Sequence, residues 1–162
     1  MAARFEYRQA QEIAAVFRRH GVRYLFIGKS GAILLGYPDT TQDADLFVEK
    51  TPENGLALVA ALAELGFDLK PEHRQEIVQG KDFVQLRSGP FDVDLVFAPD
   101  GIESFAAAEA RSLVVEGLPV CHLDDISLPT TSIVKASGHQ FRPDINIILS
   151  VGRHCRIPRG SA

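Results

Sequence analysis

The sequence predicts an α/β or α+β domain built on a small mixed β-sheet with helices packed around it. Segments with helical apolar spacing alternate with short apolar strands, and a β-hairpin interrupts this alternation. A chain of 162 residues is long enough to bury one full core. No repeat or low-complexity tract marks a second domain, so we expect one domain over residues 1–150 and a basic tail over residues 151–162.

The first third of the chain carries the clearest local signals. Apolar residues recur at helical spacing over residues 4–19, and Gly21 supplies the stop. Thr51-Pro52-Glu53 is a helix start, with threonine as the cap and proline at the first position, and this helix is expected to end at Gly66. The elements expected between them are a strand over Val22–Ile27, a short helix over Lys29–Leu35 and a strand over Ala44–Glu49.

The remaining segments include one hairpin. The segments FVQLR and FDVDLVF, separated by Ser88-Gly89-Pro90, predict two paired strands. The polar residues 68–81 predict a loop or a poorly defined helix. The other expected elements are a helix over 101–110, one or two strands in 112–121 around Gly117, and helices over 124–137 and 143–151.

Composition and charge exclude several classes of protein. No apolar run approaches the roughly 20 residues of a membrane span, and the N-terminal residues do not resemble a signal peptide. Two cysteines do not make a disulfide framework, so a cytoplasmic protein with no membrane partner is expected. From Lys135 onward the chain carries five Lys or Arg and one acid, although its net charge is −4. This basic end fits either an RNA-facing segment or a solvated terminus.

Gly28-Lys29-Ser30 matches the end of the phosphate-binding P-loop motif, G-x-x-x-x-G-K-[ST]. The position of the first glycine is occupied by Arg23, and the residues that follow it are typical of a strand. A P-loop is therefore not predicted. A strand, a glycine turn and a helix N-terminus remain, an arrangement that favours an anion, although the glycines also simply permit a tight turn.

Two Asp-x-Asp pairs stand on predicted strands. Asp43 and Asp45 lie two residues apart, as do Asp92 and Asp94, so each pair projects from one face of its strand with about 6.5–7 Å between positions. On neighbouring strands these carboxylates would converge on one or two Mg²⁺ ions that bridge a triphosphate. The alternative is a set of edge-strand carboxylates that face water.

The segment from Gly28 to Val48 resembles the signature of the polymerase-β-type nucleotidyltransferase superfamily: a glycine turn, a short helix, Asp-x-Asp, and a third Asp on a later strand. The segments FDVDLVF, LPVCHLDDI, TSIVKASG and FRPDINIIL are similar to the AbiEii- and MenT-type branch, which includes toxins of toxin–antitoxin systems. The resemblance implies a minimal nucleotidyltransferase fold and Mg²⁺-dependent transfer of NMP from an NTP to an acceptor hydroxyl. The implied acceptor is a tRNA 3′ end or a protein, and the implied partner is a cognate antitoxin.

The resemblance also assigns roles to individual residues. It implies that Asp43, Asp45 and Asp94 bind metal and are catalytic together with Lys135, with Asp92 as the other choice for the third carboxylate. The residues it assigns to the nucleotide are Gly28, Lys29, Ser30, Arg142 and Asp144. The sequence departs from the family at Lys29, where a small residue is usual, and at Asp39, where a basic residue is expected.

Two other functions fit the same residues. One is a small-molecule nucleotidyltransferase of the antibiotic-modifying type. The other is a catalytically degenerate binding module of the same fold, which Lys29 and Asp39 motivate. A zinc site is not predicted, because Cys121-His122 and His154-Cys155 lack metal-ligand spacing.

Overall fold

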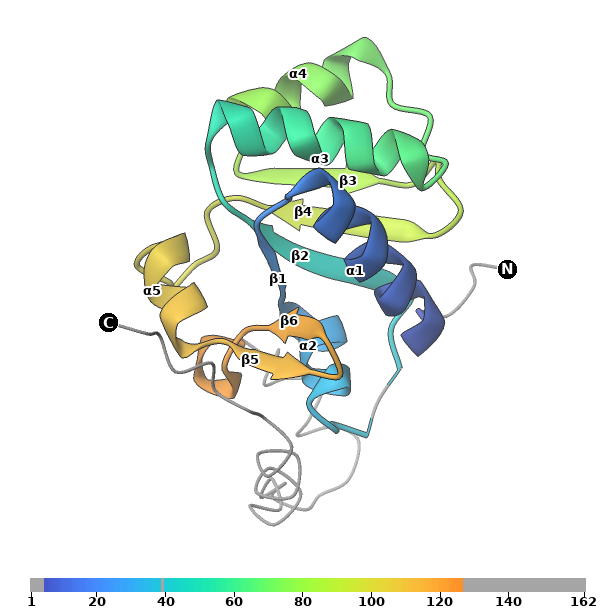
Figure 1. The fold of residues 1–162 in the computed structure, drawn as a ribbon. Helices are drawn as coiled ribbons and strands as arrows, with labels where there is room; N and C mark the ends of the chain where they lie inside the picture. Colours follow the sequence, from blue (N-terminus) through green and yellow to red (C-terminus); the bar gives the residue numbers. More distant parts are fainter. Residues whose placement is uncertain (1–4, 39, 127–162) are drawn as a thin grey trace.

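The computed structural model describes residues 5–38 and 40–126, and these residues form a six-stranded mixed sheet with helices on both faces (Figure 1). The strand order is β3-β4-β2-β1-β6-β5. The β2–β4 and β1–β6 pairs are parallel, and the other three pairs are antiparallel. The predicted α+β class with a mixed sheet is confirmed. The strands are β1 (Tyr24–Phe26), β2 (Asp43–Val48), β3 (Phe83–Leu86), β4 (Asp92–Val96), β5 (Leu113–Val115) and β6 (Leu118–Val120).

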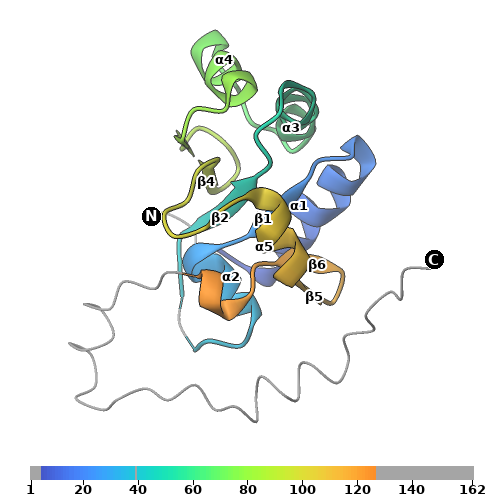
Figure 2. The same ribbon diagram turned by 90° about the vertical axis from the view of Figure 1, so that its left-hand side faces the viewer.

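The helices form layers on the two sides of this sheet. Helices α1 and α3 lie on one side and α2 lies on the other, as the two perpendicular views show (Figures 1 and 2). Helix α3 packs against both α1 and α4, and α2 packs against β2. The helices are α1 (Tyr7–His20), α2 (Gly28–Leu34), α3 (Pro52–Glu64), α4 (Pro71–Gln79) and α5 (Phe105–Arg111), followed by a 3₁₀ turn over Leu123–Asp125.

Most predicted elements are present within one to four residues of their expected ends, and the predicted hairpin is the β3–β4 pair. The segment predicted as a loop or a poorly defined helix is instead the regular helix α4, which begins with Pro71 and ends at Gly80. Its apolar signal is weak because only Ile77 is buried. Gly55 of α3 allows α4 to approach α3 closely, since a Cβ at position 55 would lie 2.9 Å from the Val78 Cα.

Several predictions fall outside the described residues. These are the helix over 143–151, the domain boundary at residue 150 and the tail over 151–162. Of the helix predicted over 124–137, the described part contains only the end of the 3₁₀ turn. Within the described part of the chain, no helix is long and apolar enough to cross a membrane.

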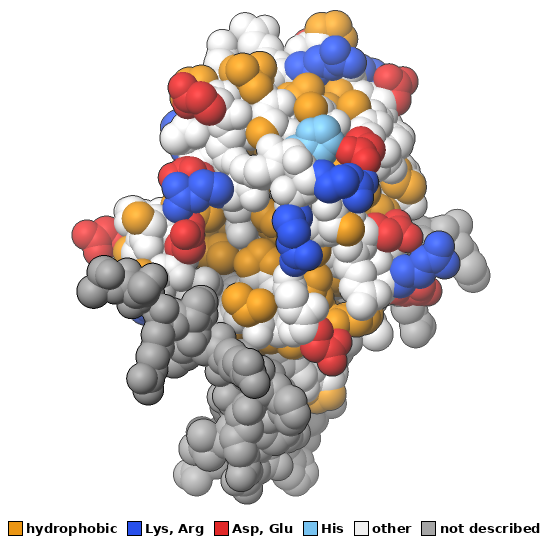
Figure 3. Space-filling view, viewed as in Figure 1, with side chains coloured by type: hydrophobic (Ala, Val, Ile, Leu, Met, Phe, Trp, Pro, Cys, Tyr) orange, Lys and Arg blue, Asp and Glu red, His pale blue; other side chains and the backbone are white. Residues whose placement is uncertain are grey.

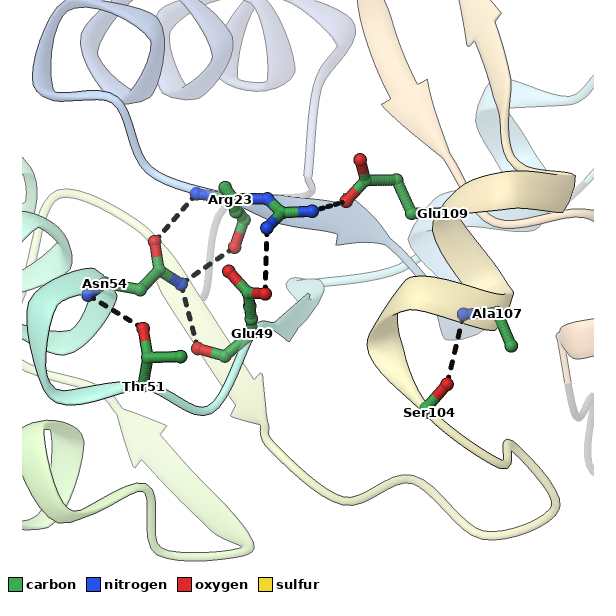
Figure 4. A network of polar contacts seen from close by, with 7 residues as sticks. All are labelled: Arg23, Glu49, Thr51, Asn54, Ser104, Ala107 and Glu109. Atoms are coloured by element: carbon green, nitrogen blue, oxygen red, sulfur yellow. Dashed lines mark hydrogen bonds and ion pairs between the residues drawn. The ribbon is translucent and has the colours of Figure 1, made fainter.

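A polar network joins the sheet to α3 and α5 (Figure 4). The buried side chain of Asn54 accepts a hydrogen bond from the backbone N–H of Arg23 at 2.8 Å and donates to the carbonyls of Arg23 and Glu49 at 3.0 and 2.9 Å. The Arg23 guanidinium forms ion pairs with Glu49 and Glu109 and lies 5.4 Å from the centre of the Phe105 ring. The network therefore fixes the start of α3 and the position of α5 relative to β1.

We predict that Asn54→Ala lowers the free energy of unfolding by about 1–3 kcal/mol, because it leaves the buried backbone N–H of Arg23 without its acceptor and removes one of the two donors to the carbonyls of Arg23 and Glu49. Leu56→Ala is the control in the same helix; its side chain is 61% exposed, so a change within about 0.5 kcal/mol is expected. Urea denaturation measures both. Equal effects of the two substitutions would show that the Asn54 hydrogen bonds contribute little.

Candidate active site

The register of the parallel β2–β4 pair places the two Asp-x-Asp motifs side by side. Asp43 lies opposite Asp92, and Asp45 lies opposite Asp94. Side chains alternate along a strand, so all four carboxylates project from the same face of the sheet. The residues between them, Ala44 and Val93, are buried on the other face. The two motifs thus form one carboxylate cluster, which we define as Asp43, Asp45, Asp92 and Asp94.

Burial and like charge make two members of this cluster, Asp45 and Asp94, costly to ionise. Burial raises the pKa of Asp45 from 3.8 to about 7, and the neighbouring carboxylates of Asp94 and Asp43 add to the rise. Burial is also the largest cause of the raised pKa of Asp94, which the nearby Arg87 opposes. Asp94 is only 9% exposed. A cation beside these groups would therefore be favourable.

The glycine turn before α2 lies directly against Asp45. Gly28 has φ +62°, and a Cβ at this position would lie 2.9 Å from Asp45 Oδ2. The backbone N–H of Ser30 is 3.5 Å from the same carboxylate oxygen. Glycine is thus required at position 28 both for its backbone conformation and for the approach to Asp45.

Ser30 has a structural part in this arrangement. Its side chain is fully buried, and its hydroxyl donates to the Ile27 carbonyl at 3.0 Å and accepts from the Asp45 backbone N–H at 2.9 Å. These bonds connect the start of α2 to β2. The hydroxyl is engaged inside the fold, whereas Lys29, the preceding residue, is partly exposed.

Arg87 is a member of the site that sequence reasoning missed. It follows β3 immediately, and its Nη2 lies 2.7 Å from Asp94 Oδ1 and 3.8 Å from Asp43 Oδ2. The hairpin register pairs Leu86 with Val93, so the next residue faces Asp92. Counting across the Ser88-Gly89-Pro90 turn would have placed this arginine beside the acids.

The carboxylate cluster has donors that suit a hard divalent cation. Carboxylate oxygens are the ligands that Mg²⁺ prefers. Asp94 Oδ1 is buried, and its contact with Arg87 lacks hydrogen-bond geometry, so this oxygen has no hydrogen-bond donor. With the side chains as they stand, no group of three or more His, Cys, Asp or Glu residues among those described is arranged to hold a metal ion. The chemistry of the donors fits Mg²⁺, and the guanidinium of Arg87 lies against two of them.

The remaining predicted site residues lie outside the described part of the chain. They are Lys135, Arg142 and Asp144; Asp39, where the sequence departs from the family pattern, also lies outside it. On the face drawn in Figure 3, Lys and Arg side chains are interspersed with Asp and Glu rather than gathered in one patch. An RNA-binding role for the chain therefore depends on the predicted basic tail or on another face.

No protein-family model matches the chain, and no curated protein matches it. Among solved structures, the chain is similar to a protein from Thermotoga maritima that is described as a "putative nucleotidyltransferase". The two chains are 18% identical, with a TM-score of 0.49, over 72% of this chain and 77% of the other. With so low an identity and TM-score, the similarity says nothing about the substrate, the metal or the AbiEii- and MenT-type branch.

We predict that Gly28→Ala destabilises the protein by about 1 kcal/mol more than Gly21→Ala, as measured by urea denaturation. Both glycines have positive φ, of 62° and 69°, but a Cβ at Gly21 meets nothing within 4 Å. The difference between the two variants therefore isolates the contact with Asp45. In the double variant with Asp45→Ala, most of the excess cost should disappear. If the additional loss of stability persists in the double variant, the contact with Asp45 is not its cause.

A second prediction concerns pH in the absence of metal. Because the pKa of Asp45 is raised from 3.8 to about 7 in the folded protein, its contribution to stability is present below about pH 4 and is lost as the pH rises to 7. Asp45→Asn should therefore match the wild type near pH 4 and exceed it by about 1–2 kcal/mol at pH 8, after allowance for partial solvent exposure. Thermal unfolding in EDTA measures the gap, with the exposed Asp68→Asn as control. A gap that does not vary with pH would contradict the assignment.

Proposed function

We propose that this protein is a Mg²⁺-dependent nucleotidyltransferase that transfers NMP from an NTP to an acceptor hydroxyl and releases pyrophosphate. The observation that carries the proposal is the carboxylate cluster, in which two Asp-x-Asp rows lie in register beside a glycine turn. This is the pattern that the resemblance of residues 28–48 implies for the polymerase-β-type superfamily and its minimal fold. The desolvated, mutually repelling acids support a site for one or two Mg²⁺ ions.

Asp43, Asp45 and Asp94 are the proposed metal ligands. When bound, Mg²⁺ supplies positive charge to the triphosphate and lowers the pKa of an oxygen nucleophile. Asp94 is a better third ligand than Asp92 because it is buried, lies opposite Asp45 and has an oxygen without a hydrogen-bond donor. We propose the same residue as the group that accepts the proton of the acceptor hydroxyl.

The proposed nucleotide contacts come from the turn beside the cluster and from a later segment of the chain. Gly28, Lys29 and Ser30 belong to the turn against Asp45, where Gly28 lets the backbone approach that carboxylate and Lys29 supplies a charge. Because Ser30 is fully buried and its hydroxyl is bonded to backbone, its proposed part is to hold the turn beside Asp45 in position for the nucleotide. A segment outside the described residues supplies the other proposed contributors: Lys135 to catalysis, and Arg142 and Asp144 to nucleotide binding.

The proposed acceptor is a tRNA 3′ end or a protein hydroxyl, in keeping with a toxin of the AbiEii and MenT type that has a cognate antitoxin. The basic composition from residue 135 onward supports an RNA acceptor. A second candidate is a binding module without activity. It is favoured by the position of Arg87, which lies against two of the proposed metal ligands.

We predict that Asp94→Asn lowers nucleotide transfer by about 100-fold or more, whereas Asp92→Asn lowers it by no more than about tenfold. The two substitutions remove the same charge from the same strand, so Asp92 is the matched control. The assay incubates each α-³²P-NTP with Mg²⁺ and, in turn, total tRNA, a protein extract and a panel of small hydroxyl compounds. Thermal unfolding verifies that both variants fold.

The label identifies the class of acceptor. Labelled tRNA or protein supports the proposal, and a labelled small molecule identifies the antibiotic-modifying alternative. Absence of label with every NTP and acceptor class contradicts the proposal and favours the binding module.

A further inference from the structure

Arg87 places one positive charge against the carboxylate cluster in the structure. Its guanidinium contacts Asp94 and Asp43 at 2.7 and 3.8 Å, and it comes from the residue after β3, beside Asp92 on the neighbouring strand. The three acids belong to two different strands, β2 and β4. A single positive charge therefore attracts carboxylates that come from two segments distant in the sequence.

The contact between Arg87 and the acids is of a kind that can be exchanged. The Arg87 side chain is 40% exposed, whereas that of Asp94 is 12% exposed. Its approach to Asp94 Oδ1 is close but lacks hydrogen-bond geometry, so the paired, two-bond fork that usually fixes arginine to a carboxylate is not formed there. A divalent ion places twice the charge among the same oxygens, and it would compete directly with the guanidinium.

We propose that Arg87 is an exchangeable counter-cation. It holds the carboxylate cluster together in the metal-free protein, leaves it when a divalent cation binds, and then contacts the phosphates of the nucleotide. The second step rests on the proposed function, whereas the exchange itself concerns only the cation and the acids. Arginine suits both positions because it is always charged and pairs with carboxylate and phosphate in the same planar geometry.

A purely structural salt bridge is the competing explanation for Arg87. In that case its loss would destabilise the β3–β4 hairpin but would leave the affinity for a divalent cation unchanged or weaker. If Arg87 exchanges with the metal, its loss should instead raise the affinity for a divalent cation, since an acid cluster without its guanidinium attracts the ion more strongly. The two explanations therefore differ in a binding constant rather than in stability alone.

The first experiment measures Mn²⁺ binding to the full chain without nucleotide, by calorimetry and by the electron paramagnetic resonance signal of free Mn²⁺. The variants are Arg87→Met, Arg87→Lys and the control Arg8→Met, whose side chain is 82% exposed on α1. Arg87→Met is expected to bind Mn²⁺ about five- to tenfold more tightly and to unfold about 3 °C lower in EDTA. Arg87→Lys and Arg8→Met should stay near the wild type in both measurements.

An unchanged or weaker Mn²⁺ affinity of folded Arg87→Met overturns the exchange, and so does a lack of binding by every variant. Binding by Arg87→Met alone would support it. Should Arg87→Met not fold, Arg87→Ala with the charge-retaining Arg87→Lys as its reference gives the same comparison. Because no nucleotide is present, these results are independent of whether the protein transfers NMP.

The second experiment adds inorganic tripolyphosphate at saturating Mn²⁺. Arg87→Met is expected to bind it about fivefold more weakly than the wild type, while Arg8→Met binds it equally well. Equal affinity of Arg87→Met and the wild type would overturn the phosphate step.

Discussion

The parallel pairing of β2 with β4 is the constraint on which the proposed site depends. It sets Asp43 opposite Asp92 and Asp45 opposite Asp94, so four acids that are distant in sequence occupy one patch of a sheet. A shift of either strand by one residue would turn that strand's acids to the other face and its apolar residues outward. The buried residues Ala44, Leu46, Val93 and Leu95 hold this register, because they alternate with the acids along the two strands and belong to the hydrophobic core on the opposite face of the sheet. The same packing that stabilises the core therefore forces the acids together.

The forced proximity of the acids explains the features around them. Gly28 gives Asp45 space that any side chain would fill, and Ser30 joins the backbone of β2 to the turn at the start of α2. Arg87, the residue after the adjacent edge strand β3, supplies positive charge. An acid cluster of this kind opposes folding unless a cation is present, which supports the proposed metal site.

The sequence predicted this site unevenly, for physical reasons. Local signals were sufficient for the helix caps at Thr51 and Gly21 and for the β3–β4 hairpin, because each depends on neighbouring residues. The two Asp-x-Asp pairs were also visible, but their pairing in register was not, since it joins strands separated by α3, α4 and β3. Helix α4 was obscured by its weak apolar pattern, and Arg87 was missed because its role appears only when the hairpin register is counted. The predicted contributors Lys135, Arg142 and Asp144 stay predictions.

The central claim is that the carboxylate cluster holds a divalent cation through Asp43, Asp45 and Asp94. The most direct measurement is a crystal structure of the protein with Mn²⁺, with data collected at a wavelength where manganese scatters anomalously. The account predicts an anomalous peak among the oxygens of these three residues, with the guanidinium of Arg87 moved away from Asp94. A structure in saturating Mn²⁺ that shows no peak there, and Arg87 still against Asp94 and Asp43, would contradict it.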